Sequence, residues 1–126
     1  MAETKPAIGV IGLGIMGGAM AEALLRAGYS VFGYDPVLAA RARLNKAGGR
    51  VLASSTAVAD QSEIIITSLA TIAALESVAK EVAASTRWPK GNPKRIVIET
   101  STLPIPDKEA AQKLWARAAA ALGPLT

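Results

Sequence analysis

Residues 7–17 have the sequence Ala-Ile-Gly-Val-Ile-Gly-Leu-Gly-Ile-Met-Gly, and this stretch predicts how the chain folds. Ala7–Ile11 is a short apolar run, typical of a buried strand, and it stops at Gly12. Helical spacing begins at Ile15 and continues to Ala27, with Met16, Met20 and Leu24 as an apolar strip. A strand, a glycine-rich turn and a helix in direct succession indicate the start of a βαβ unit.

The alternation of strands and helices continues along the chain. Further strands are predicted at Ser30–Tyr34, Arg50–Ala53, Ile64–Leu69 and Ile96–Ile98, and helices at Val37–Ala47, Ser54–Gln61, Thr71–Ala84 and Asp107–Leu122. The strands are apolar throughout instead of alternating, which favours a sheet covered on both faces. We therefore expect an α/β fold with a doubly wound, mostly parallel sheet, forming one domain over residues 1–126.

Composition excludes several kinds of chemistry. The 126 residues contain no cysteine and no histidine, so Cys–His metal sites, thiol nucleophiles, Ser–His–Asp triads and disulfides are excluded within this chain. No apolar run reaches the roughly 18–20 residues of a membrane span. Met1–Pro6 is polar and carries no secretion signal, and together with the missing cysteines this favours a cytoplasmic location.

The formal net charge of +4 raises the question of a polyanionic partner. The basic residues form two loose groups, one at residues 41–50 and one in the Pro- and Gly-containing stretch at residues 87–95. Trp88 is the one aromatic residue within these groups, so aromatic and basic residues do not alternate as they would in a surface that stacks on bases. We therefore expect no nucleic-acid partner.

The glycine-rich turn matches the pattern G-x-G-x-x-G in Gly12-Leu13-Gly14-Ile15-Met16-Gly17. The pattern alone is weak, but here it follows a predicted strand and opens a predicted helix, as a dinucleotide-binding turn does. The first glycine permits the tight turn, the second leaves room for a pyrophosphate, and the third lets the helix lie close to the strand. Backbone N–H groups of these six residues then face the phosphates. The alternative is a glycine-rich turn without a ligand.

Asp35 stands at the end of the second predicted strand, 18 positions after Gly17. A carboxylate there accepts hydrogen bonds from the adenosine ribose and repels a 2′-phosphate, which favours NAD over NADP. The alternative is that Asp35 and Pro36 simply form a turn. Arg41 and Arg43 bear on the choice of cofactor, because a nearby arginine can bind a 2′-phosphate. They lie in the next predicted helix, so reaching that phosphate requires a turn back past Pro36.

Three stretches together resemble a known family. Residues 10–21, Val-Ile-Gly-Leu-Gly-Ile-Met-Gly-Gly-Ala-Met-Ala, are similar to the opening signature of the β-hydroxyacid dehydrogenases. That family includes 3-hydroxyisobutyrate dehydrogenase, tartronate semialdehyde (2-hydroxy-3-oxopropionate) reductase and, more distantly, 6-phosphogluconate dehydrogenase. The likeness continues in Ile64–Ala70 and in residues 97–102, Val-Ile-Glu-Thr-Ser-Thr, which are similar to the family's D-x-S-T.

The resemblance implies further contacts with a dinucleotide. It places Leu69, Ala70 and Ala74 along the cofactor, and Thr102 on the nicotinamide side with Ser101 beside it, next to the substrate. Each position has an ordinary structural alternative. Ser101 and Thr102 can cap the last helix or form a local turn, and Leu69 can belong to the core.

The resemblance also implies that the chain is one half of an enzyme. In the family, a Ser-Gly-Gly strand that holds the substrate carboxylate follows, and then a helix with the catalytic lysine and a helical second domain that forms the dimer. These lie beyond Gly123–Thr126, so we expect a Rossmann-type cofactor-binding half with no catalytic residue of its own. Without the helical domain, Leu114, Trp115 and Leu122 would form an exposed apolar face.

The expected parent activity is hydride transfer between NAD and a short 3-hydroxy acid. Two alternatives belong to other classes of protein. One is a dinucleotide-sensing module without catalysis, and the other is a different reductase that shares only the fold, such as a relative of pyrroline carboxylate reductase or ketol-acid reductoisomerase.

Overall fold

A computed structural model describes residues 5–85 and 96–121 of the chain. The elements, in chain order, are β1 (Ile8–Ile11), α1 (Ile15–Arg26), β2 (Val31–Tyr34), α2 (Leu38–Lys46), β3 (Arg50–Val51), α3 (Ser55–Gln61), β4 (Ile64–Thr67), α4 (Ile72–Ala83), β5 (Ile96–Glu99) and α5 (Ile105–Ala121). Every predicted element is present, and its ends lie within two residues of the predicted ones. The whole basic stretch at residues 87–95 lies outside the described residues, and so does Leu122.

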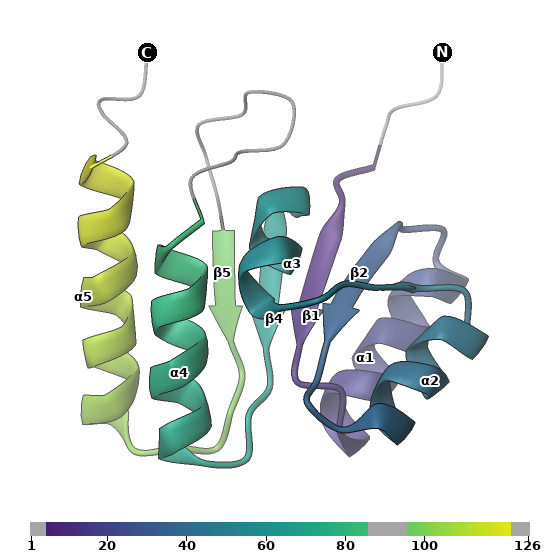
Figure 1. The fold of residues 1–126 in the computed structure, drawn as a ribbon, viewed down its shortest axis with the longest axis horizontal. Coiled ribbons are helices and arrows are strands. Elements are labelled where there is room, and N and C mark those ends of the chain that lie inside the picture. The colour runs from purple at the N-terminus through teal and green to yellow at the C-terminus, as the bar shows by residue number, and fades with distance from the viewer. Residues whose placement is uncertain (1–4, 86–95, 122–126) are drawn as a thin grey trace.

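The strands form one parallel sheet in the order β3-β2-β1-β4-β5 (Figure 1). The chain runs outward from β1 to β3, then crosses back to place β4 on the other side of β1. The strand order therefore reverses between β1 and β4, which is where open α/β sheets bind their ligands. This confirms the predicted doubly wound α/β fold.

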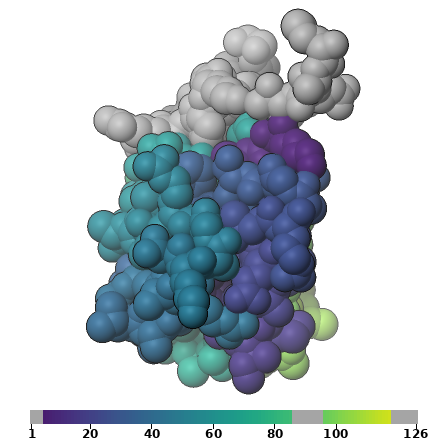
Figure 2. Space-filling view, turned by 90° about the vertical axis from the view of Figure 1, so that its right-hand side faces the viewer, coloured from purple at the N-terminus to yellow at the C-terminus, as the bar shows by residue number. Residues whose placement is uncertain are grey.

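Two helical layers cover the sheet from opposite sides. On one side Leu44 of α2 packs with Val10 and Val31, and on the other Val58 of α3 packs with Ile65. α4 joins the second layer, and α5 packs against α4. Figure 2 looks at the side of the molecule that α1 and α2 occupy, where these helices and the segment leading from α2 into α3 form the surface.

The face that α1 turns toward the sheet differs from the predicted one. Met16, which the spacing placed on an apolar strip, is 67% exposed, whereas Gly17, Gly18 and Ala21 are buried. A Cβ atom built on Gly17 would lie 1.8 Å from the carbonyl oxygen of Gly12. The helix thus begins so close to the turn that only small residues fit beneath it, and the methionine is turned outward.

The expectation of a sheet covered on both faces is wrong for β5. Ile96 and Ile98 are 54% and 46% exposed, and they pair in register with the half-buried Ile64 and Ile66. These four side chains lie on the face that α1 and α2 cover farther along the sheet. Within the described residues, no helix reaches this part of that face.

The prediction of an exposed apolar face on α5 is also wrong for its two described residues. Leu114 and Trp115 are half-buried, because they pack against α4. Trp115 Nε1 donates a hydrogen bond to the carbonyl oxygen of Ala79 at 3.1 Å. Across the described segments, no helix has the length and apolar character that crossing a membrane requires.

Candidate functional site

The glycines of the turn between β1 and α1 have two different roles, one in the fold and one in leaving room for a ligand. Gly12 has a φ of +93°, and a Cβ there would lie 2.0 Å from the carbonyl oxygen of Ser68. Gly12 and Gly17 are therefore required by the fold itself. A Cβ on Gly14, by contrast, would meet nothing within 4 Å, so the backbone at this position borders open space. A ligand can approach the chain at Gly14.

The first turn of α1 keeps its donors available. Gly14 is the N-cap residue, and no side chain caps the helix by a hydrogen bond. The first N–H groups of a helix have no partner within the helix, so they remain free for an anion. Ile15 and Met16 are exposed beside them, at 86% and 67%. Leu13 differs from the expectation, because its side chain is in the core and its N–H donates to Asp35 Oδ2 at 2.8 Å.

Asp35, just after β2, joins this turn to the next one. Its Oδ2 accepts from Leu13, and its Oδ1 accepts from the N–H of Val37 at 2.8 Å. The second bond is the local turn that the Asp–Pro alternative predicted. The first crosses to the glycine-rich turn and holds the carboxylate over the carboxyl end of β1. Asp35 therefore forms a turn and also borders the site.

The two arginines of α2 separate in the structure. Arg41 Nη1 donates to the carbonyl oxygens of Asp35 and Pro36 at 2.8 and 2.9 Å. Its side chain thus folds back past Pro36, which the sequence argument had treated as an obstacle. Arg43 forms an ion pair with Glu22 of α1 at 3.1 Å. Of the two, Arg41 brings its positive charge to the rim of the site.

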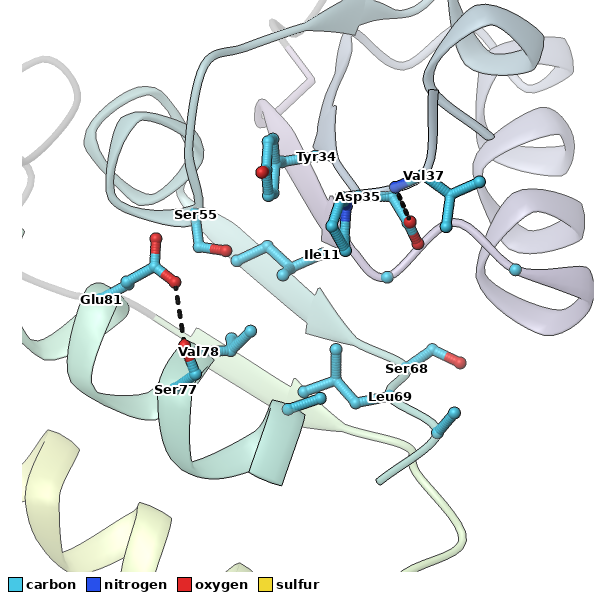
Figure 3. A pocket seen from close by; sticks show the side chains of 15 residues that line it. Ile11, Tyr34, Asp35, Val37, Ser55, Ser68, Leu69, Ser77, Val78 and Glu81 are labelled. Carbon is cyan, nitrogen blue, oxygen red and sulfur yellow. Dashed lines mark hydrogen bonds between the residues drawn. The ribbon is translucent and has the colours of Figure 1, made fainter. Parts of the chain in front are cut away.

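A pocket of about 460 Å³ opens at the point where the strand order reverses (Figure 3). Seven of the residues predicted to contact a dinucleotide line it: Gly12, Gly14, Asp35, Pro36, Leu69, Ala70 and Ala74. The other predicted residues do not line it: Leu13, Ile15, Met16, Gly17, Ser101 and Thr102. Gly17 supports the turn from below, and Thr102 is exposed.

The other eight lining residues were not predicted from the sequence. Ser77, Val78 and Glu81 follow Ala74 by three, four and seven positions on α4, so helical spacing could have found them. Ser55 had no such signal, because the pairing of the strands brings α3 to this place. The remaining lining residues come from the ends of β1 and β2 and the loop after β4: Ile11, Tyr34, Val37 and Ser68.

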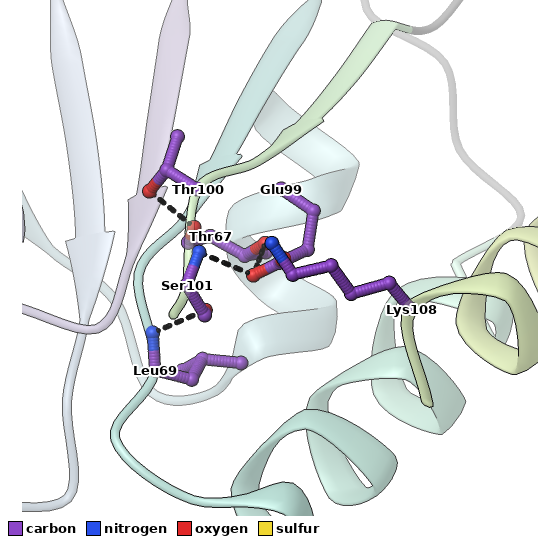
Figure 4. Close-up of polar contacts among 6 residues, drawn as sticks. All are labelled: Thr67, Leu69, Glu99, Thr100, Ser101 and Lys108. Atoms are coloured by element: carbon purple, nitrogen blue, oxygen red, sulfur yellow. Dashed lines mark hydrogen bonds and ion pairs between the residues drawn. The ribbon is translucent and has the colours of Figure 1, made fainter. Parts of the chain in front are cut away.

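A polar network ties the loops that follow β4 and β5 (Figure 4). The N–H of Leu69 donates to Ser101 Oγ at 2.7 Å, and the N–H of Ser101 donates to Glu99 Oε1 at 2.9 Å. Thr67 Oγ1 donates to the same Oε1 at 3.3 Å, and Lys108 Nζ forms an ion pair with Oε2 at 3.0 Å. Ser101 is buried, so its hydroxyl positions Leu69 instead of facing the pocket.

Glu99 is ionised within this network. Burial acts to raise the pKa of its carboxyl, but the hydrogen bonds from Ser101 and the contact with Lys108 outweigh burial. The pKa of Glu99 therefore lies below its ordinary value of 4.5. The negative charge stays in place at neutral pH and keeps both loops together.

The arrangement suits a dinucleotide. It combines an uncapped helix start, a backbone position open to close approach, a carboxylate at the end of β2 and a largely apolar pocket. The described residues contain no group of three or more His, Cys, Asp or Glu able to hold a metal ion.

Comparison with known proteins agrees with this geometry. Residues 7–123 match the family described as the NAD binding domain of 6-phosphogluconate dehydrogenase. The chain belongs to this family. The resemblance to the β-hydroxyacid dehydrogenases is thereby confirmed for their NAD-binding domain.

This NAD-binding domain is 34% identical over 113 residues to human mitochondrial 3-hydroxyisobutyrate dehydrogenase, covering 88% of the chain and 33% of that protein. It thus spans about a third of the length of the curated relatives it matches. The structure of Mycobacterium tuberculosis 3-hydroxyisobutyrate dehydrogenase with L-serine is 26% identical, with a TM-score of 0.82 over 92% of this chain and 38% of that one.

Imine reductase from Myxococcus stipitatus shares the fold as well. A variant in complex with NAD⁺ has a TM-score of 0.77 at 23% identity, and a complex with NADP⁺ has 0.75 at 22%. They cover 92% and 90% of this chain and 38% of each reductase chain. At these identities, the likeness shows the common fold only.

Proposed function

We propose that this chain binds NAD across the carboxyl ends of β1, β2 and β4, with the pyrophosphate at the start of α1. The observation that carries the proposal is Gly14, whose missing side chain leaves open space between the uncapped helix and the pocket. Asp35 stands where it can accept from the adenosine ribose once its contact with Leu13 is shared or exchanged. All of residues 1–126 would serve this one binding domain.

The activity proposed for the whole protein is oxidation or reduction of a short 3-hydroxy acid, of the 3-hydroxyisobutyrate or 2-hydroxy-3-oxopropionate type. The nicotinamide ring supplies the hydride chemistry when the cofactor is bound. This chain's own residues bind and orient: the glycine-rich turn holds the phosphates, and the Ser101–Leu69 contact shapes the loop beside them. Among the described residues no lysine lines the pocket, and we propose that the proton-transferring group comes from outside this domain.

We assign NAD as the preferred cofactor, with NADP as the less favoured one. The Asp35 carboxylate would repel a 2′-phosphate, and Arg41 would attract it. Arg41 Nη1 already donates to two carbonyl oxygens, whereas the Asp35 carboxylate borders the pocket directly. Both groups already have hydrogen-bond partners, but Asp35 lines the pocket and Arg41 does not, so we propose that the repulsion outweighs the attraction. Assembly into a homo-oligomer through the helical domain of the family belongs to the same proposal.

Melting temperatures with NAD⁺, NADH and NADP⁺ test the proposal. A ligand at about 100 times its dissociation constant stabilises by roughly 2.7 kcal/mol, or several degrees for a domain of this size. We expect a shift with both NAD forms and a smaller one with NADP⁺. A larger shift with NADP⁺ would reverse the cofactor assignment, and no shift with any of the three at millimolar concentration would contradict binding by this chain.

A further inference from the structure

The pocket has a second, polar end that the glycine-rich turn and Asp35 do not use. Ser55, the first residue of α3, lines it with a side chain that is 1% exposed. Its Oγ has no hydrogen-bond partner among the described residues. A buried hydroxyl without a partner is destabilising, and such groups in folded proteins call for an explanation. Ser55 is one of the residues that line the pocket, so a ligand bound there is the partner that the position allows.

Glu81 lies at the same end of the pocket. Thr56 Oγ1 donates to the carbonyl oxygen of Glu81 at 2.7 Å, which holds the start of α3 against this part of α4. Glu81 lines the pocket, and among the described residues its carboxylate has one long contact, 3.5 Å, from Ser77 Oγ to Oε2. Figure 3 draws Glu81 and Ser55 toward one side, away from Ser68 and Leu69. This end of the pocket thus offers a charged acceptor beside a free hydroxyl.

Between this end and the turn the walls are mostly apolar. Ala74 and Val78 of α4 form one wall, and Tyr34, the last residue of β2, and Val37 line the pocket as well. A planar ring system suits such walls, because its faces need apolar contact and its edge needs hydrogen bonds. In the dinucleotide pose proposed above, Asp35 lies between the glycine-rich turn and this apolar part of the pocket, which we call the slot. The ring that reaches the slot is therefore the base attached to the adenosine ribose.

We infer that Glu81 and Ser55 recognise the edge of the adenine base. The Glu81 carboxylate accepts a hydrogen bond from the exocyclic amino group of the base, and Ser55 Oγ donates a hydrogen bond to a ring nitrogen. This rests on the proposed dinucleotide binding and adds a determinant of base specificity. A carboxylate accepts from an amino group and repels a carbonyl oxygen in the same place. The site should therefore discriminate against hypoxanthine, which carries oxygen where adenine carries the amino group.

The experiment compares dissociation constants for NAD⁺ and nicotinamide hypoxanthine dinucleotide, measured by calorimetry on the 126-residue chain. We expect the adenine form to bind at least about tenfold more tightly, as a hydrogen bond to a charged group implies. Glu81→Gln should reduce this ratio to about threefold or less, because an amide both donates and accepts. Glu76→Gln is the matched control, since it makes the same change on α4 at a residue that lines a different cavity beside α5, and its ratio should stay that of the wild type.

Ser55→Ala separates binding from folding. It removes a hydroxyl that has no partner without ligand, so the melting temperature of the free chain should be unchanged or higher, while NAD⁺ binds several-fold more weakly. A variant that melts lower and binds NAD⁺ normally would overturn the role of Ser55. Equal wild-type affinity for both dinucleotides would overturn the inference and leave dinucleotide binding intact. Failure of both to bind would contradict the proposed function itself.

Discussion

At the scale of single residues, three glycines that look equivalent in the sequence have different physical roles. Gly12 and Gly17 have no room for a Cβ, since the atom would lie 2.0 and 1.8 Å from backbone oxygens. Gly14 has open space in front of it. The first two therefore act in folding, and the third can act in binding without affecting the fold.

Gly14→Ala and Gly17→Ala should therefore have opposite effects. The alanine at residue 14 should cost less than about 1 kcal/mol of unfolding free energy, a typical difference at a helix N-cap, and lower NADH affinity at least about tenfold by blocking the phosphates. The alanine at residue 17 should cost about 3 kcal/mol or more, because backbone has to move. Urea unfolding and NADH fluorescence titration measure both. Normal NADH binding by Gly14→Ala would contradict the pose.

Asp35→Asn tests the assignment of NAD over NADP by replacing one carboxylate oxygen with an amino group. The amide keeps one acceptor for the N–H of Leu13 or Val37 and removes the charge that repels a 2′-phosphate. The ratio of the NADP⁺ and NAD⁺ dissociation constants should fall by about tenfold, equivalent to about 1.4 kcal/mol. Asp107→Asn removes the same charge beside a different cavity and should leave the ratio unchanged. Titration calorimetry with both cofactors decides, and an unchanged ratio in Asp35→Asn would argue against the repulsion.

At the scale of elements, the ends of β4 and β5 behave as one unit. Ser101 holds the N–H of Leu69, and Glu99 holds the N–H of Ser101 while pairing with Lys108 on α5. A strand end, the neighbouring loop and the next helix are thus linked through one carboxylate. Since Leu69 lines the pocket, this network sets the shape of one wall.

The network predicts how stability depends on pH. The pKa of Glu99 is lowered in the folded chain, so its contribution is present above the ordinary value of 4.5 and is lost as pH falls through the folded value. Glu99→Gln should lower stability at pH 7 and show a smaller further loss between about pH 5 and pH 3. Urea unfolding over this range checks it. Glu76→Gln should follow the wild-type slope, and equal slopes in all three proteins would rule out the role of Glu99.

At the scale of the whole molecule, the reversal of strand order gathers the site. The turn after β1, the turn after β2 and the loop after β4 meet at one edge of the sheet, and α4 supplies the opposite wall. Each contributes binding groups, and no lysine is among the described residues that line the pocket. We therefore expect this chain to bind a cofactor and to catalyse no reaction.

The prediction is that 126 residues alone show no steady-state turnover of 3-hydroxyisobutyrate with NAD⁺ or of 2-hydroxy-3-oxopropionate with NADH. The physical reason is that hydride transfer from a hydroxy acid needs a group that takes the hydroxyl proton, and the two carboxylates that line the pocket, Asp35 and Glu81, are assigned above to the adenosine end of the cofactor. Absorbance of NADH at substrate saturation measures the rate. A rate above that of the Gly14→Ala variant would contradict the prediction, and turnover by this chain joined to a helical domain of the family would exclude a pure sensing module.

The sequence by itself determined the elements, the parallel sheet and the place of the dinucleotide turn. These depend on local properties: apolar runs, helical spacing, and glycines that only certain backbone turns require. Asp35 was within reach of the same reasoning, because its position at a strand end follows from chain order. So was its turn with Pro36, which the bond to Val37 bears out.

Only the tertiary structure decided which faces are buried and which distant residues meet. Met16 was assigned to an apolar strip, yet contact between Gly17 and the turn brings the small residues inward and leaves the methionine exposed. The Arg41 side chain folds back past Pro36 because it donates hydrogen bonds to two backbone carbonyl oxygens there. Ser55 and Glu81 line the same pocket only because the strand order brings α3 against α4. Such contacts join segments far apart in the chain, and no local pattern of residues encodes them.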